Sequence, residues 1–187
     1  MSDFIIQNVP GGGVVASSAN AGICLPFTNF VPSAAESTSV FGAANTQEEI
    51  QFISTQTITL GHVTVVIGTG VAAATMGIAI YNAAGTTKLG AADGFSVDTG
   101  HTGAQRNSLN QSVTLSQGGV YWLAWTATTG TTLTCVNFLM SVNFQAGYNA
   151  GATRSGTSGT GTSGGNTNST IGTVSSAQLR IPLMIFD

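Results

Sequence analysis

Apolar residues recur at every second position along much of this chain, and this period most constrains how it can fold. The longest example lies between residues 135 and 144, where Val136, Phe138, Met140, Val142 and Phe144 alternate with mostly polar neighbours. A period of two is typical of a β-strand with one buried face, whereas a helix repeats its apolar positions every three to four residues. We therefore expect a strand here, with the face that carries Val136 directed into the core.

The same alternation predicts strands in several other parts of the chain: residues 49–52, 57–67, 76–81, 113–125 and 179–185. Near Gly61 and His62 the apolar phase slips by one residue, which is typical of a β-bulge. No segment shows a sustained helical stripe. About eight strands without crossover helices predict an all-β protein built as an antiparallel β-sandwich. A jelly-roll-like order of strands is our first expectation, and an immunoglobulin-like Greek key is the alternative.

Residues 1–45 differ from the rest, because short apolar clusters are interrupted there by proline and glycine. Three of the four prolines lie in this segment, at Pro10, Pro26 and Pro32. Proline cannot donate a ladder hydrogen bond, and glycine loosens the backbone. The pattern predicts an extended N-terminal arm over residues 1–45 and a β-sandwich domain over residues 46–187. The alternative is that the first segment supplies an edge strand and loops to its own domain.

Residues 147–172 consist almost entirely of Gly, Ser, Thr, Asn and Ala. Such a composition predicts a loop within the sandwich domain. It is not a linker to a second domain, because only one predicted strand follows. That strand contains Pro182, which favours an edge position or a bulge.

Charged residues make up only 6% of the chain and the formal net charge is −3, whereas ordinary soluble domains are about 25% charged. So few cations exclude binding of nucleic acid in a groove that neutralises its phosphates, and they also exclude a basic membrane-surface helix. The chain contains no run of about 20 apolar residues, so we expect no insertion into a membrane. Its first residues do not resemble a secretory signal.

A surface rich in uncharged hydrogen-bonding groups suits contact with other subunits, so we expect an assembling protein. The alternative is a monomer with an uncharged, well hydrated surface. The candidate assembly contacts are the apolar residues of the arm: Phe4, Ile5, Ile6, Val14, Val15, Ile23 and Leu25.

Few residues are candidates for chemistry. Asp98 and His101 are close enough to pair in one loop, but no nucleophile-elbow sequence accompanies them, so a solvated turn is the expected role and catalysis the minor alternative. His62 is expected to be a structural histidine. No motif predicts a catalytic site, a cofactor site or a metal site, although calcium held by backbone carbonyls with Asp93 or Asp98 stays open.

The two cysteines, Cys24 and Cys135, lie far apart in the sequence and form no CxxC motif. Buried free thiols are the expected state, and a disulfide is the alternative.

Aromatic residues in the segment 120–125 could stack on a sugar ring. Tyr121, Leu123 and Trp125 share one face of the predicted strand and have the spacing of core residues, while Trp122 lies on the other face. Trp122 is therefore the stronger candidate for a ligand contact, and we group it with His101 and Asp98 as tentative glycan contacts.

Three segments carry a resemblance to a known group of proteins: Ile58–Val65 (ITLGHVTV), Gly77–Thr86 (GIAIYNAAGT) and Val113–Ala124 (VTLSQGGVYWLA). Over about residues 50–130 they resemble β-sandwich modules of tailed-bacteriophage virion proteins. The resemblance implies a location on the virion surface, as a capsid decoration or cement protein, a head fibre or a tail receptor-binding protein, often as a homotrimer.

Together these features predict a non-enzymatic virion structural protein, synthesised in the host cytoplasm. We expect a homotrimeric capsid decoration or cement protein whose arm binds the major capsid protein or another virion protein. The alternative is a tail or baseplate receptor-binding protein that recognises a host glycan through Trp122, the loop 93–106 or the Gly-rich loop. A hydrolase that uses His101 is a third, weaker reading.

Overall fold

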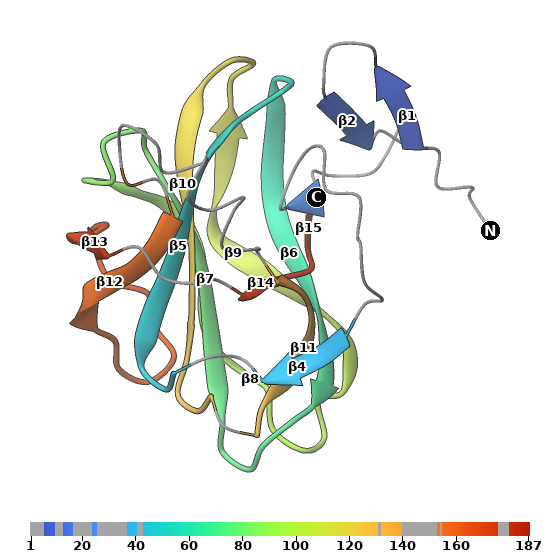
Figure 1. Cartoon of the computed structure of the whole chain (residues 1–187), viewed down its shortest axis with the longest axis vertical. Coiled ribbons are helices and arrows are strands. Elements are labelled where there is room, and N and C mark those ends of the chain that lie inside the picture. Colours follow the sequence, from blue (N-terminus) through green and yellow to red (C-terminus); the bar gives the residue numbers. More distant parts are fainter. Residues whose placement is uncertain are drawn as a thin grey trace.

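The computed structural model describes residues 6–9, 13–16, 24–25, 37–40, 43–130, 132–139, 153, 155–175 and 180–187. The described chain forms β-strands and no helix (Figure 1). The strands and their bounds are β1 (Ile6–Val9), β2 (Gly13–Ala16), β3 (Cys24–Leu25), β4 (Ser37–Val40), β5 (Thr46–Ile53), β6 (Ile58–Thr69), β7 (Thr75–Tyr81), β8 (Lys88–Ser96), β9 (Gly103–Leu115), β10 (Val120–Ala127), β11 (Thr134–Leu139), β12 (Ser155–Gly161), β13 (Val174–Ser175), β14 (Arg180–Pro182) and β15 (Met184–Phe186).

Two antiparallel sheets pack face to face as a sandwich (Figure 1). Four strands of the first sheet have the order β5-β10-β7-β8, and four strands of the second have the order β4-β11-β6-β9. From β4 to β11, successive strands alternate between the two sheets, except that β7 and β8 form a hairpin within one sheet. This alternation is the jelly-roll arrangement, so the predicted fold is confirmed.

Strands from the predicted arm take part in this fold. The jelly roll begins with β4, which pairs with β11, and β3 pairs with β15. The sandwich therefore includes residues that we assigned to the arm 1–45, in line with the alternative of an edge strand on the chain's own domain. In contrast, β1 and β2 pair with each other in a separate two-stranded sheet (Figure 1).

The main core lies between the two sheets, and strand β10 shows how the sequence builds it. Leu123 and Trp125 are fully buried in this core, whereas Trp122 belongs to a second cluster on the outer face of the first sheet. The Nε1 atom of Trp125 donates a hydrogen bond of 3.1 Å to Oε2 of Glu48. The predicted division of β10 into two faces is therefore confirmed.

Strand β11 has the opposite phase from the one expected. Cys135 lies in the main core, with 1% of its surface exposed, and Asn137 is also buried, while Val136 is only half-buried. The expectation that the Val136 face forms the core is wrong at these positions. The pairing of β11 with β6 shifts register between Thr134 and Cys135, and such an irregularity reverses the faces that follow it.

The thiol of Cys135 is free. Burial in the core raises its pKa to about 12, which makes it an inert structural thiol, because the thiolate is the reactive form.

The bulge predicted near Gly61 is present. The pairing of β6 with β9 shifts register between Leu60 and His62. At this place the backbone N–H groups of Gly61 and His62 both donate to the carbonyl oxygen of Asp187, at 2.7 and 2.8 Å. The bulge thus provides two donors that fix the residue after β15.

In the last predicted strand, residues 179–185, the pattern of burial also differs from the expected alternation. Ile181, Met184 and Phe186 are fully buried, whereas Leu183 and Ile185 are half-buried. The strand breaks after Pro182, and the N–H of Leu183 donates to the carbonyl of Val136 at 2.8 Å. The predicted single alternation is therefore split into two short strands, β14 and β15, with the interruption at the proline, as its chemistry favours.

The Gly-rich segment is more ordered than the loop we expected over residues 147–172. Residues 155–161 form β12, which pairs with β5 and extends the first sheet. Residues 162–173, which we call the strap, then cross the outer face of this sheet, and β13 follows and pairs with β12. The strap residues make backbone contacts with Gly94 and Gly85 and cover the second apolar cluster, which consists of Ala79, Tyr81, Ala91, Trp122 and Ala124. A composition of small residues permits this close approach to the sheet.

Candidate functional site

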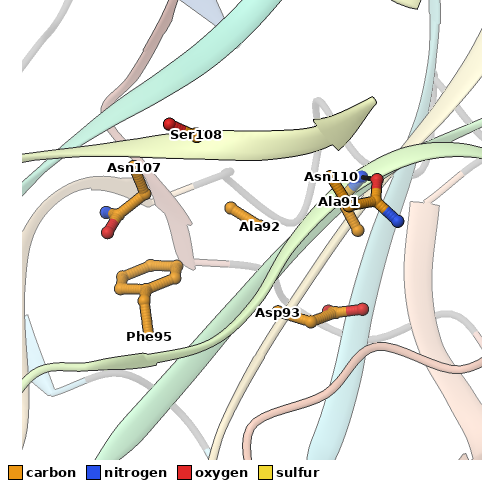
Figure 2. Close-up of a pocket in the computed structure, with 7 residues that line it drawn as sticks. All are labelled: Ala91, Ala92, Asp93, Phe95, Asn107, Ser108 and Asn110. Atoms are coloured by element: carbon orange, nitrogen blue, oxygen red, sulfur yellow. Dashed lines mark hydrogen bonds between the residues drawn. The ribbon is translucent and has the colours of Figure 1, made fainter. Parts of the chain in front are cut away.

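A hollow of about 260 Å³ lies between β8 and β9. These strands belong to different sheets, so the hollow opens at the side of the sandwich. Figure 2 shows the residues that line it: Ala91, Ala92, Asp93, Phe95, Asn107, Ser108 and Asn110. It combines a small apolar floor with side-chain amides, which is the general make-up of small-molecule sites.

The hollow exists because β9 leaves β6 and leans toward β8. The pairing of β9 with β6 is interrupted between Ser108 and Val113. In this interval Oδ1 of Asn110 accepts the N–H of Ala91 at 2.9 Å, and the Gln111 amide donates to the carbonyl of Leu89. These two hydrogen bonds hold β8 and β9 together at one end of the hollow, and the two strands separate beyond it.

The close approach of β8 to β9 at this end of the hollow depends on Gly90. A Cβ atom at this position would overlap Cγ2 of Val113 and would lie 2.9 Å from the carbonyl oxygen of Gln111. A glycine in a strand is typical of places where another backbone comes this close.

The register of β9 against β6 determines which side chains of β9 face the hollow. Asn107 pairs with Val63, which is fully buried, so the Asn107 side chain lies on the core side of the second sheet. Ser108 pairs with His62 and lies on the other side. In Figure 2 the ring of Phe95 rises from β8 toward the amide of Asn107. The functional groups of the hollow are therefore one aromatic ring and the amides of Asn107 and Asn110.

The hollow has no free charge. Oδ2 of Asp93 lies 2.9 Å from Nζ of Lys88, and Oδ1 accepts two hydrogen bonds of 2.8 Å from the backbone and hydroxyl of Thr167 in the strap. Both carboxylate oxygens are thus used within the protein. In Figure 2 the carboxylate is turned away from Phe95. Asp93 therefore fixes the strap rather than a ligand.

Asp98 and His101 do pair, in an exposed turn outside the hollow. Nδ1 of His101 lies 2.7 Å from Oδ1 of Asp98, and Gly100 N–H and the Ser96 hydroxyl donate to the same carboxylate. The hydrogen bond from His101, followed by those from Gly100 and Ser96, lowers the pKa of Asp98. Because Ser96 and His101 both bind Asp98, they do not form the nucleophile–base–acid order of a hydrolase.

Trp122 is buried, with 7% of its surface exposed. Its Nε1 donates to the carbonyl of Ala83 at 3.1 Å, and its ring packs in the second cluster beneath the strap. Its ring therefore offers no open face for stacking. Of the three tentative glycan contacts, Asp98 and His101 are brought together, whereas Trp122 lies in the second cluster beneath the strap.

The candidate assembly contacts fall partly outside the described residues. Phe4, Ile5 and Ile23 lie outside them. Of the remaining contacts, Ile6 belongs to β1, Val14 and Val15 to β2, and Leu25 to β3.

A second polar cluster surrounds the bulge. Arg106 donates to Oδ2 of Asp187 at 2.7 Å and to Nδ1 of His62 at 2.9 Å. A guanidinium group can only donate hydrogen bonds, so Nδ1 of His62 is the acceptor. The cluster holds the chain end against β6, which agrees with the structural role expected for His62.

Of the residues that line the hollow, the sequence singled out Asp93, as a possible calcium ligand and as the start of the loop 93–106. The other lining residues were not named individually, because positions 91–107 contain little apolar alternation. Phe95 is the one aromatic residue in this interval and is the signal that could have marked it.

Within the described ranges, no three His, Cys, Asp or Glu residues come together as a possible metal site. The same residues form no helix that is long and apolar enough to cross a membrane. No protein-family model and no curated protein sequence matches the chain.

Proposed function

We propose that this protein is a non-enzymatic structural protein of a virus particle. In this proposal it forms a homotrimer on the capsid surface as a decoration or cement protein, and its N-terminal segment binds the major capsid protein or another virion protein. The resemblance to tailed-bacteriophage modules supports this reading. The jelly-roll arrangement supports it too, because the fold recurs in viral capsid domains and also in lectins.

The observation that carries the proposal is that the first two strands pair only with each other among the described strands. The β1–β2 hairpin pairs with no other described strand, and Figure 1 shows it outside the two layers. An isolated two-stranded hairpin is at best marginally stable in water, and a third strand or a packing surface is needed to hold it. A neighbouring protein would supply that surface.

The charges of the described surface support a covered location. Every charged side chain that the structure describes is either paired or buried: the pairs are Lys88–Asp93, Arg106–Asp187 and His101–Asp98, and the buried residues are Glu48 and Glu49. Protein interfaces are depleted of charged residues at their centres. A surface whose charges are satisfied internally is therefore easily covered by another subunit.

The test is to remove residues 2–16, which contain the hairpin, while β3 and β4 stay in place. The full chain should sediment at three times its mass of 18.8 kDa, and the truncated chain should form the same trimer but fail to join particles when produced with the other virion proteins. A chain in which residues 2–16 are replaced by a Gly/Ser segment of equal length is the control for length. A monomeric full chain, or normal incorporation of the truncated chain, would refute the proposal.

A second function, recognition of a host glycan by a tail or baseplate protein, is favoured by one observation. The hollow between β8 and β9 presents an aromatic ring beside two side-chain amides without a free charge.

A further inference from the structure

We propose that the hollow between β8 and β9 binds one neutral pyranose ring of a glycan. This inference rests on the second function above and names its ligand class and its residues. The volume of about 260 Å³ lies just below the range of about 300–1,000 Å³ that accommodates drug-sized ligands. The site therefore suits a single sugar ring rather than an extended chain.

The apolar part of the hollow suits the C–H face of a sugar. Ala91 and Ala92 are buried and Phe95 is half-buried, so the aromatic ring combines support from the core with an open part. An aromatic face pairs with the apolar face of a pyranose ring and buries it from water. Partial packing of Phe95 against the main core holds the ring in place before a ligand arrives, which reduces the entropy lost on binding.

The polar part suits hydroxyl groups, which both donate and accept hydrogen bonds. Oδ1 of Asn110 is occupied by the N–H of Ala91, so its amide N–H groups are left as donors. The Asn107 amide makes one long contact of 3.4 Å, from Nδ2 to the carbonyl of Gln105, and its Oδ1 accepts no hydrogen bond from the described residues. The hollow thus offers the Oδ1 acceptor of Asn107 and the N–H donors of Asn110.

The electrostatics select an uncharged sugar. Asp93 is the one ionisable residue among those that line the hollow, and its charge is balanced by Lys88 at 2.9 Å. An acidic sugar would bring a carboxylate into a site without a free cation, where losing its hydration would not be compensated.

The binding test uses the purified full chain and NMR spectra of its amide groups. The probes are the methyl glycosides of glucose, galactose, mannose and N-acetylglucosamine, with glucuronic acid as the charged comparison. We expect at least one neutral glycoside to shift the side-chain amide signals of Asn107 and Asn110 with a Kd of about 1 mM, and glucuronic acid to bind at least about tenfold more weakly. No saturable shift with any neutral glycoside, shifts confined to other residues, or equal binding of glucuronic acid would each overturn the proposal.

Two variants test the named residues. Asn107→Ala and Phe95→Leu should each weaken binding at least about tenfold, while Ser112→Ala, at an exposed position of β9 outside the hollow, should bind like the original chain. Asn107 makes only one long contact, so its variant should fold even if Phe95→Leu does not. Unchanged affinity in Asn107→Ala would overturn the proposal. Sedimentation of the same samples reports the trimer separately, so failure of sugar binding is distinguishable from failure of the assembly.

Discussion

Glu48 and Glu49 are adjacent on β5 and point to opposite faces of the first sheet. Glu48 lies on the core side and accepts the indole N–H of Trp125. Glu49 lies beneath the strap, is 0% exposed, and accepts one hydrogen bond from Gln47 at 2.9 Å. Its Oε1 accepts none from the described residues. An ionised carboxylate in this position would lack the partners that its charge requires.

The surroundings of Glu49 connect it to the strap. Oε1 of Gln47 accepts the N–H of Asn168 at 2.8 Å, and the hydroxyl of Tyr81 donates to the carbonyl of Asn168 at 2.6 Å. Burial, and to a lesser extent the charges of Asp93 and Glu49, raise the pKa of Tyr81. One strap residue is therefore held at both of its backbone groups by side chains that lie next to Glu49.

Replacing Glu49 with Gln should change how stability depends on pH. Burial raises the pKa of Glu49 from its ordinary value of 4.5 to about 7, against the opposing hydrogen bond from Gln47. A raised pKa in an acid means that the folded protein holds the proton more tightly than the unfolded chain. The stabilisation that Glu49 contributes to the folded state is fully present below pH 4.5 and is lost as the pH rises to about 7. The loss in unfolding free energy is up to about 3 kcal/mol.

Denaturant unfolding at pH 4 and pH 8 measures this effect. The Glu49→Gln variant should match the original chain at the lower pH and exceed it in unfolding free energy at the higher pH, by up to about 3 kcal/mol. The same pH dependence in both proteins would show that Glu49 is not held protonated by the fold.

At the scale of elements, the strap depends on the absence of side chains where it meets the sheet. A Cβ atom on Gly77 of β7 would overlap the carbonyl oxygen of Gly165 and would lie 2.8 Å from Oδ1 of Asp93. Both atoms belong to groups that are fixed by hydrogen bonds, since the Gly165 carbonyl accepts the N–H of Gly94 at 3.1 Å. Neither can move without breaking a contact between strap and sheet.

Gly77→Ala should therefore displace the strap and lower stability by about 1–3 kcal/mol. Gly61→Ala is the matched control, because the nearest atom to its Cβ would be the carbonyl oxygen of Asp187 at 3.9 Å, and its effect should stay within about 0.5 kcal/mol. Hydrogen exchange of the strap amides, with thermal unfolding, measures both. Equal behaviour of the two variants would mean that the strap does not depend on this contact.

The way in which each strand is buried determines whether its sequence could predict it. Strands β6, β7 and β10 have one face in a large core, so their apolar residues alternate visibly. Strand β8 begins Lys88-Leu89-Gly90-Ala91-Ala92, and its small residues fit under the strap and against β9 without an alternating pattern. The same applies to β12, whose Gly and Ser residues extend an edge of the sheet. Phe95 and Asn107 could not be joined from sequence, because their proximity depends on the interrupted pairing of β9.

At the scale of the whole molecule, the described part of the jelly roll and the strap contain few charged groups that salt can influence. The charged side chains that the structure describes on the surface are paired with one another: Lys88 with Asp93, Arg106 with Asp187, and His101 with Asp98. The hydrogen-bonding groups of the remaining surface are mainly Thr, Ser, Asn and Gln. If copies of this chain associate through such surfaces, apolar burial and neutral hydrogen bonds hold them together, and both act over shorter distances than charge.

The proposed trimer should therefore keep its mass when the ionic strength is raised. At about 1 M salt the screening length falls to about 3 Å, which weakens interactions between exposed charges on different subunits. Sedimentation of the full chain at low salt and at this concentration should give the same mass, at three times 18.8 kDa. The exposed Arg106–Asp187 pair offers an internal control, since Arg106→Gln removes it and should leave the assembly intact. A trimer that separates in salt, or that is lost in this variant, would place charge at the subunit contacts and contradict an interface built from neutral surfaces.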